Sequence, residues 1–175
     1  PIDENLALQH FNHLIEKTTK EGFVHYEISN FGKPDYFSKH NTSYWQGKSY
    51  LGIGPSAHSF SKAQRSWNVA NNSKYIQAIQ NDSLPSTVEV LSKKDQYNEY
   101  VMTGLRTIWG VSLYRIETEF GTEYLQYLKT ASQNFINERL LEITSFSNSP
   151  NLSVLKTTQK GKFLVDGIAS ELFMI

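Results

Sequence analysis

The sequence predicts two regions of different class: an α/β segment at the start of the chain and a mostly helical α+β region at its end. Two observations support this division. Residues 4–60 combine one helical pattern with two short apolar runs, whereas residues 91–139 contain three helical patterns in succession. A predicted hairpin and a closing helix follow these three helices. That order of elements is typical of a winged-helix-like module.

The α/β segment opens with an amphipathic helix at residues 4–20. Its apolar residues recur at helical spacing, and Gly22 follows its end. Short strands are expected at 23–28 and at about 49–53, with a loop between them that Gly32 and Pro34 interrupt. Two strands do not make a stable sheet alone, so the rest of this sheet is expected outside the sequence. The start at Pro1, without Met, also suggests a piece of a longer protein.

The second region is expected to follow a linker with a short helix at 63–90. Ser92 and Asp95 form a capping-box pattern that begins a helix ending at Gly110. A second helix is expected at 113–120 and a third at about 122–139. The runs "LLEITSF" and "LSVLKT" predict a hairpin with a turn at 147–151, and a closing helix is expected after it, at 159–175.

Composition excludes several classes of function. The chain has no Cys, so it cannot supply disulfides, thiolate nucleophiles or the ligands of an iron–sulfur cluster. Seventeen basic and seventeen acidic residues cancel, which removes a general attraction to nucleic acid or anionic membranes. No apolar run is long enough to span a bilayer, and no secretory signal is visible at the N-terminus. A cytoplasmic location is therefore expected.

A winged-helix shape raises DNA binding as an alternative function. Residues 91–175 carry nine basic and nine acidic side chains. The third helix, which would read the DNA, offers Lys129 and Arg139 against Glu123 and Glu138 and lacks a basic face. The charges favour a structural module and predict no nucleic-acid partner.

Aromatic residues and histidines gather between residues 23 and 67, where ten of the chain's twenty-three aromatic residues fall. Such rings can anchor loops, and they can also line a pocket for a flat ligand. His40, in the expected loop, is a candidate axial ligand for haem iron or a residue that fixes the loop. His58 is a candidate ligand contact at the end of a strand, or else a satisfied polar residue.

Glycines in "GIGPSAHS" allow a close approach by a ligand or by another part of the backbone. Gly52 and Gly54 flank Ile53, but the third glycine and the following helix of a dinucleotide-binding fingerprint are missing. His10 and His13 lie three residues apart on the first helix without a supporting cluster, so they are a weak metal pattern. No nucleophile elbow or phosphate-binding loop is visible, which predicts that the chain alone has no catalytic residue.

Two stretches together resemble one family closely. "YEISNFGKPDYFSKHNTSYW" followed by "YLGIGPSAHSF" is similar to the radical S-adenosylmethionine (SAM) family of oxygen-independent coproporphyrinogen III oxidase-like proteins, and within it to the haem-chaperone branch, HemW. The H-N-x-x-Y-W motif of that branch is matched at residues 40–45. "RSWN", "LRTIWGV" and "TTQKGKFLVDGI" extend the resemblance over the whole chain. Gly32 and Asp35 depart from the family's usual residues in the loop.

The resemblance implies a barrel that binds SAM and a [4Fe-4S] cluster, and a protein that delivers haem to acceptor proteins. It places the end of a radical SAM (β/α) barrel at 1–62 and a winged-helix-like C-terminal domain at 91–175. The family's cysteine motif is not in this sequence, so this piece alone is expected to be inactive and to hold no metal cluster. The resemblance leaves open whether the full-length protein forms a dimer.

The resemblance also assigns candidate binding residues. It implies a haem-associated set, made up of His40, Asn41, Tyr44 and Trp45. It also implies a set that faces the SAM pocket, made up of Gly52, Gly54, Ala57 and His58. A true coproporphyrinogen III oxidase is the alternative function, and the H-N-x-x-Y-W motif argues against it. A winged-helix nucleic-acid-binding module is the other alternative.

Overall fold

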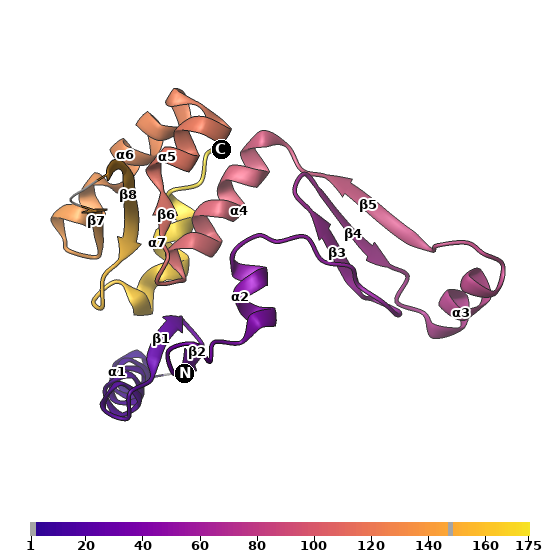
Figure 1. Cartoon of the computed structure of the whole chain (residues 1–175), viewed down its shortest axis with the longest axis horizontal. Coiled ribbons are helices and arrows are strands. Elements are labelled where there is room, and N and C mark those ends of the chain that lie inside the picture. Colours follow the sequence, from indigo (N-terminus) through magenta and orange to yellow (C-terminus); the bar gives the residue numbers. More distant parts are fainter. Residues whose placement is uncertain (1–2, 147–148) are drawn as a thin grey trace.

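The computed structural model describes residues 3–146 and 149–175 of the chain. Figure 1 shows an N-terminal helix and hairpin, an extended three-stranded arm, and a helical C-terminal part. The short helix α2 (Lys39–Trp45) lies between the hairpin and the connection to the arm. Within the described residues, no helix is both long enough and apolar enough to cross a membrane.

The N-terminal part consists of α1 (Glu4–Lys20) and the antiparallel strands β1 (Val24–Glu27) and β2 (Asn30–Gly32). The side chain of Asp3 accepts hydrogen bonds from two backbone N–H groups in the first turn of α1, which fixes the predicted start of this helix. The strand predicted at 23–28 is present as β1. The strand predicted at 49–53 is wrong, because only Tyr50 makes a bridge there, with Phe60.

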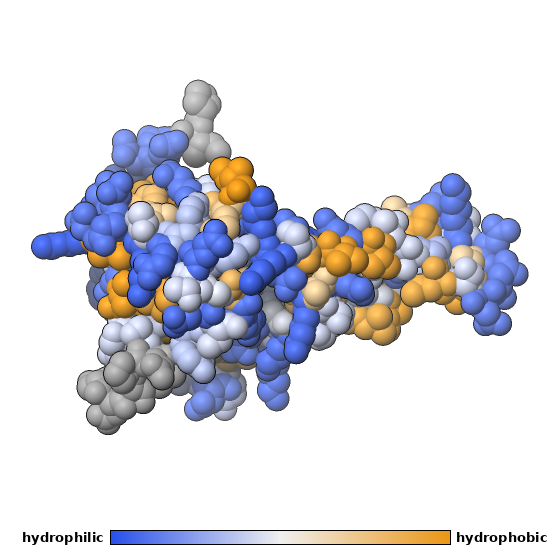
Figure 2. All heavy atoms as spheres, turned by 90° about the horizontal axis from the view of Figure 1, so that it is seen from above, coloured by the Kyte–Doolittle hydropathy of each residue, from blue (hydrophilic) through white to orange (hydrophobic). Residues whose placement is uncertain are grey.

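The arm is an antiparallel sheet in the order β3 (His58–Ser61), β4 (Gln64–Asn68) and β5 (Ser86–Val90). Helix α3 (Asn72–Gln80) connects β4 to β5 at the far end of the arm (Figure 1). The predicted linker at 63–90 therefore contains the expected short helix but also two strands that the sequence did not reveal. Figure 2 shows apolar surface exposed along the arm. Leu84, Val88 and Val90 are exposed there, as are Leu51 and Ile53 in the segment that leads to β3.

The C-terminal part follows the predicted order of elements, with one added strand. Its elements are α4 (Lys93–Leu105), β6 (Val111–Ser112), α5 (Leu113–Arg115), a π-helical turn (Ile116–Phe120), α6 (Thr122–Asn137), β7 (Leu141–Phe146), β8 (Ser149–Thr157), a 3₁₀ turn (Lys162–Leu164) and α7 (Val165–Glu171). The strands pair in the order β6-β8-β7. Part of the turn predicted at 147–151 lies outside the described residues.

Two predicted helices are shorter than expected. The first ends at Leu105 rather than Gly110, and the closing helix proper covers only residues 165–171. Gly110 has a φ of +69°, and a Cβ there would lie 2.6 Å from the carbonyl oxygen of Leu155. Gly110 thus lets the chain pass close to β8 and enter β6 instead of ending a helix.

The hydrophobic core lies in the C-terminal part, and β1 is attached to it. Its fully buried side chains include Tyr97 and Val101 in α4, Leu128 in α6, Leu155 in β8 and Leu172, directly after α7. Backbone hydrogen bonds join β1 to the end of α4, from Ile28 N–H to the Arg106 carbonyl at 3.1 Å and from Ile108 N–H to the Tyr26 carbonyl at 3.1 Å. The hairpin that precedes α2 is therefore fixed to the core.

Candidate functional site

The stretch from His40 to Trp45 forms most of helix α2 rather than the loop that was expected. Ser38 caps this helix, since its hydroxyl accepts a hydrogen bond from the backbone N–H of Asn41 at 3.3 Å. Side chains four residues apart share a face of a helix. His40 and Tyr44 therefore lie on one face of α2, and Asn41 and Trp45 lie on a neighbouring face.

These two faces differ in their exposure. His40 is exposed and the Tyr44 side chain is 50% exposed, whereas Asn41 and Trp45 are half-buried. The H-N-x-x-Y-W motif thus presents its first and fifth residues to solvent and uses its second and sixth residues for contact with the protein. We call these the open face and the anchored face of α2.

Asn41 anchors α2 through a chain of hydrogen bonds to a buried carboxylate. Its Nδ2 donates to Asn30 Oδ1 at 2.9 Å, and Asn30 Nδ2 in turn donates to Glu27 Oε2. The backbone N–H of Ser29 donates to the same Glu27 oxygen at 3.0 Å. Glu27 is only 1% exposed, so these donors stabilise a carboxylate that water does not reach.

Trp45 anchors the same face through Arg106, at the end of α4. The guanidinium lies over the Trp45 ring, 5.3 Å from its centre, which is a cation–π contact. Arg106 Nη2 and Nε donate to Glu27 Oε1 at 3.1 and 3.2 Å, and Nη1 pairs with Asp166 in α7. The anchored face of α2 and the C-terminal core are therefore joined at one buried ion pair.

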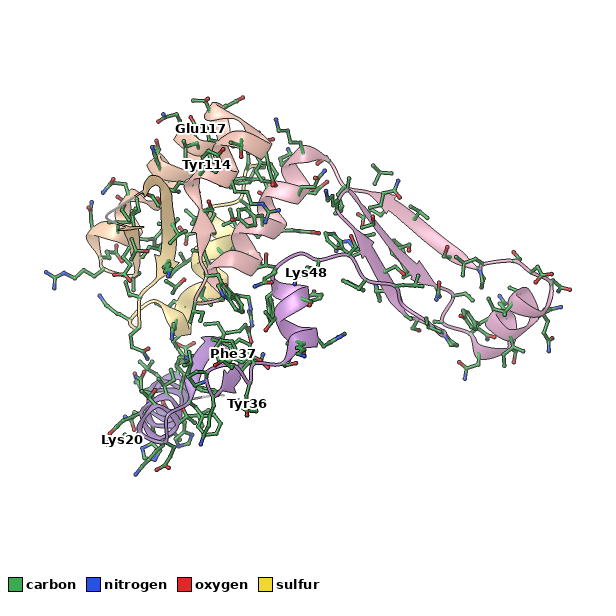
Figure 3. All side chains as sticks on the ribbon, in the orientation of Figure 1. Lys20, Tyr36, Phe37, Lys48, Tyr114 and Glu117 are labelled. Atoms are coloured by element: carbon green, nitrogen blue, oxygen red, sulfur yellow. The ribbon has the colours of Figure 1, made fainter. Side chains whose placement is uncertain are left out.

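The loop before α2 is also fixed by an aromatic contact. The ring of Phe37 stacks on that of Tyr26 with their centres 4.4 Å apart, whereas its neighbour Tyr36 is 84% exposed (Figure 3). Phe37 therefore anchors the loop, which is one of the two roles predicted for the aromatic residues of this region. Tyr36 and Tyr44 are instead exposed to solvent.

A series of rings connects the open face of α2 to the arm. The centre of the Tyr44 ring lies 5.2 Å from that of Trp45 and 5.9 Å from that of Tyr50. Tyr50 then stacks on Phe60 at 6.1 Å, and the two residues exchange backbone hydrogen bonds of 3.0 Å. Burial, and next the nearby Tyr44, raises the pKa of the Tyr50 hydroxyl above its ordinary value.

The glycines in "GIGPSAHS" serve a turn in which the backbone returns on itself. A Cβ on Gly52 would lie 2.2 Å from the carbonyl oxygen of His58, so Gly52 is required by a neighbouring backbone segment. Gly54 has a φ of +107° with open space where a Cβ would be. The buried Asn68 holds the turn, since its Nδ2 donates to the Gly54 carbonyl at 2.9 Å.

His58 is the first residue of β3, on the arm and not on α2. Its side chain is exposed and borders a depression that Ser56, Trp67 and Asn68 also line. Ala57, the last candidate on this turn, donates its backbone N–H to the Gly54 carbonyl at 3.3 Å. The structure therefore groups the second set of candidate residues at one turn of the arm and places the first set on α2.

Sequence reasoning missed the residues that hold α2 in place. Glu27, Asn30 and Arg106 form the network behind the anchored face, and none of them was singled out. A signal existed for Glu27, because an acidic residue inside an otherwise apolar and aromatic strand is either exposed or paired with a buried partner. Its partner lies 79 residues away, so the sequence did not identify Arg106.

The open face has one side chain that suits a metal-containing ligand. In residues 3–146 and 149–175, no three His, Cys, Asp or Glu side chains come together as a metal site. His40 would therefore act as a single ligand, which is sufficient for haem, because the porphyrin supplies four of the iron's ligands and one imidazole can supply an axial one. The neighbouring Tyr44 ring offers an apolar surface for the porphyrin edge.

Comparison with known families identifies one domain and several relatives. The family model of the HemN C-terminal domain matches residues 91–145. The chain is 34% identical over 131 residues to a protein named heme chaperone HemW from Lactococcus lactis, which covers 75% of this chain and 34% of the relative. A heme chaperone HemW from Synechocystis is 31% identical over 156 residues, covering 86% of this chain and 38% of the relative.

A solved structure shows the same fold. HemN from Escherichia coli, described as a coproporphyrinogen III oxidase and a radical SAM enzyme, superposes with a TM-score of 0.67 at 16% sequence identity. The superposition covers 93% of this chain and 40% of HemN. The chain spans about a third of the length of the curated relatives named above. Together, the matched domain model, the relatives and the shared fold show that this chain belongs to the HemW-like branch of the radical SAM, coproporphyrinogen III oxidase-like family.

Proposed function

We propose that the chain is the C-terminal part of a haem chaperone, which binds haem and delivers it to acceptor proteins. The open face of α2 carries this proposal. On it, the exposed His40 and the half-exposed Tyr44 stand side by side, while Asn41 and Trp45 hold the helix to the core. The names of the HemW relatives support the same function.

In this proposal the four motif residues have two roles. His40 Nε2 or Nδ1 binds the haem iron, and the Tyr44 ring packs along the porphyrin edge. Asn41 and Trp45 are positioning residues that act through Glu27 and Arg106. Haem bound on an exposed helix is accessible to an acceptor protein, which suits a chaperone that must release its ligand.

The second set of residues is proposed to border a cofactor pocket of the full-length protein. Gly54 leaves open space beside its Cα, and His58 is exposed on the same turn as Gly52 and Ala57. When bound, a [4Fe-4S] cluster with SAM supplies radical chemistry. The 175 residues contain no Cys, so the thiolate ligands of such a cluster must come from outside them.

The domain division is part of the same proposal. Residues 1–62 are proposed as the end of the radical SAM barrel, 63–90 as the connection, and 91–175 as a winged-helix-like domain. The order helix, strand, helix, helix, strand, strand from α4 to β8 supports the winged-helix assignment, and so does the sheet order β6-β8-β7.

Haem titration of the 175-residue chain tests the haem site. We expect a saturable change in the Soret band for the wild type, and at least a tenfold weaker affinity for His40→Ala, which is about 1.4 kcal/mol. His13→Ala is the matched control, because His13 is also exposed on a helix. His58→Ala tests whether the turn on the arm contributes to haem binding.

Three outcomes would reject His40 as the haem ligand. These are no change in the wild-type Soret band, equal affinities for His40→Ala and the wild type, or an equal loss in the His13→Ala control. Circular dichroism of each variant should confirm that α2 and the core remain folded.

Coproporphyrinogen III oxidase activity is the second candidate function, and the shared fold with HemN favours it. An assay of the full-length protein with coproporphyrinogen III, SAM and a reconstituted cluster distinguishes the oxidase from the haem chaperone. Decarboxylation of the substrate at rates that support turnover would favour the oxidase over the chaperone.

A further inference from the structure

A second concave site lies between β1 and the C-terminal part, in a position that the haem proposal does not use. Its cavity has a volume of about 260 Å³. Residues from β1, the end of α4, β7, β8 and the turn before α7 line it. Most enclosed sites for drug-sized ligands are larger than this, so the cavity suits a small molecule or one side group of a larger molecule.

A buried histidine and a lysine meet in this cavity. His25 is 6% exposed, and its ring stacks on that of Phe31 with the centres 4.3 Å apart. His25 Nε2 lies 2.9 Å from the carbonyl oxygen of Ile28, which can only accept, so Nε2 carries the proton. The other ring nitrogen, Nδ1, therefore has a free lone pair and accepts a hydrogen bond from Lys162 Nζ at 3.1 Å.

Burial acts on both groups of this pair. It lowers the pKa of the His25 imidazole, which favours the neutral ring that accepts from Lys162. It also lowers the pKa of the Lys162 ammonium. The ammonium loses hydration in this position, and a neutral imidazole does not balance its charge.

The other charged residues of the cavity leave Lys162 without a counter-ion. Glu27 is taken by Arg106, and Glu142 stands opposite Lys156 across the β7–β8 pair. Within residues 3–146 and 149–175, no carboxylate forms an ion pair with Lys162. Among the lining side chains, positive charges outnumber negative ones by one, while Asp166 pairs with Arg106 from outside the lining. The lining charge without an ion-pair partner lies on the partly desolvated ammonium of Lys162.

We propose that this cavity binds a single carboxylate group on the ammonium of Lys162. An ammonium has three N–H donors, and in the described part of the chain one of them goes to His25 and no other acceptor is found. Two donors remain, which matches the two oxygens of one carboxylate. A carboxylate also carries the single negative charge that the excess requires, whereas a phosphate dianion would need a further cation.

The carboxylate can come from two sources with the same chemistry. A small free organic acid fits the volume of the cavity, and so does the carboxylate side chain of a larger molecule such as a tetrapyrrole. The groups that would contact each ligand are different, His40 and Tyr44 for haem and Lys162 for the carboxylate, although Glu27 and Arg106 line the cavity and also hold α2 in place. The carboxylate proposal therefore does not require haem binding at His40.

Nitrogen-15 NMR of the His25 ring tests the proposal on the 175-residue chain. Acetate and propionate are titrated at constant ionic strength, with chloride and inorganic phosphate as comparison anions. We expect a saturable shift of the His25 Nδ1 signal with the two carboxylates and affinities at least tenfold weaker for chloride and phosphate. Lys162→Gln should weaken acetate binding by at least tenfold.

The matched control is Lys160→Gln. Lys160 lies two residues away, is exposed, and donates to the Glu138 carbonyl at 3.1 Å outside the cavity. The Lys160→Gln variant should bind acetate with the same affinity as the wild type. Thermal unfolding and the ring signals of Phe31 show whether Lys162→Gln keeps the fold around His25. If they change, Lys162→Arg serves as the second variant and should retain acetate binding.

A final addition of coproporphyrin, a tetracarboxylate, distinguishes the two sources. Displacement of acetate in the wild type identifies the carboxylate of a larger molecule as the ligand, and no displacement identifies a small acid. The proposal is overturned if acetate produces no saturable shift, if folded Lys162→Gln binds acetate as well as the wild type does, or if phosphate binds more tightly than acetate.

Discussion

The guanidinium of Arg106 lies 5.3 Å from the centre of the Trp45 ring and also donates two hydrogen bonds to Glu27, of 3.1 and 3.2 Å. This one side chain therefore connects the last residue of α2 to a buried carboxylate of β1. The position of the open face of α2 relative to the core therefore depends on the Arg106 side chain. The ion pair is shielded from water, since the side chains of Arg106 and Glu27 are 18% and 0% exposed.

Arg106→Met should destabilise the protein strongly. It leaves Glu27 as a buried charge without its main partner, and loss of one member of a buried pair typically costs about 3–5 kcal/mol of the free energy of unfolding. Urea denaturation measures this change. The double variant Glu27→Gln, Arg106→Met should recover part of the loss, because no buried charge then remains.

Lys20→Met is the control for this experiment. Lys20 pairs with Glu16 on the exposed surface of α1, where water screens the interaction, so its removal should change the unfolding free energy little. If Arg106→Met proved as mild as Lys20→Met, the buried pair would not hold α2 to the core.

Trp45→Leu should weaken haem binding while His40 remains in place. Loss of the ring removes the cation–π contact, typically about 0.5–2 kcal/mol, and loosens the anchored face of α2. We expect a haem affinity about three- to tenfold weaker by Soret titration, with the wavelength of the bound band unchanged because the axial ligand is the same. A shifted band would mean that Trp45 contacts the haem or that His40 no longer binds it.

Gly52→Ala should disrupt the turn on the arm. The new methyl group would lie 2.2 Å from the His58 carbonyl oxygen, and the backbone must move to admit it, at a cost of about 1–3 kcal/mol. Gly167→Ala is the matched control. It lies in helix α7 with nothing within 4 Å, and should stabilise the protein by about 0.4–1 kcal/mol. Thermal denaturation of both variants measures the difference, and equal melting temperatures would contradict the close approach.

Elements with local signals were predictable from the sequence. Helix α1 begins at Asp3, which caps it, and α4 begins with the Ser92–Asp95 capping box, in which each side chain accepts from the other residue's backbone N–H. Such signals lie within one helical turn and do not depend on the rest of the fold. The starts of α1 and α4 were therefore predicted correctly, and so was the end of α1, whereas α4 ends at Leu105 and not at Gly110.

Helix α2 and the strands of the arm were not predictable in this way. Helix α2 has seven residues, no apolar repeat and no buried residue, so its stability comes from Asn41 and Trp45 contacting a distant ion pair. Strand β4, with the sequence "QRSWN", is mostly polar and is defined by its neighbours β3 and β5. His40 was proposed as a site residue from the motif, but the sequence did not predict the helix that makes its side chain exposed.

The helical C-terminal part should not bind DNA. Helix α6 offers Lys129 against Glu123, and residues 91–175 are neutral overall, so the phosphate contacts that supply most non-specific affinity are missing. A mobility-shift assay with duplex DNA at physiological salt should show no complex. A retarded band that weakens steeply as the salt rises would contradict this and favour a nucleic-acid-binding module.

The stability of the protein should depend on pH through His25. Burial lowers the pKa of its imidazole in the folded state, so below the unfolded value of about 6.5 the unfolded chain binds more protons than the folded one. The free energy of unfolding should therefore fall as the pH falls from 6.5 toward the lowered folded pKa, by at most about 1.4 kcal/mol per pH unit. Urea denaturation between pH 7.5 and 5 measures how steeply the free energy of unfolding depends on pH.

Two variants assign this pH dependence. His25→Gln should reduce it, although this variant is less stable at every pH. His13→Gln, at an exposed position on α1, should leave it unchanged. A slope that survives in His25→Gln would assign the dependence to other groups.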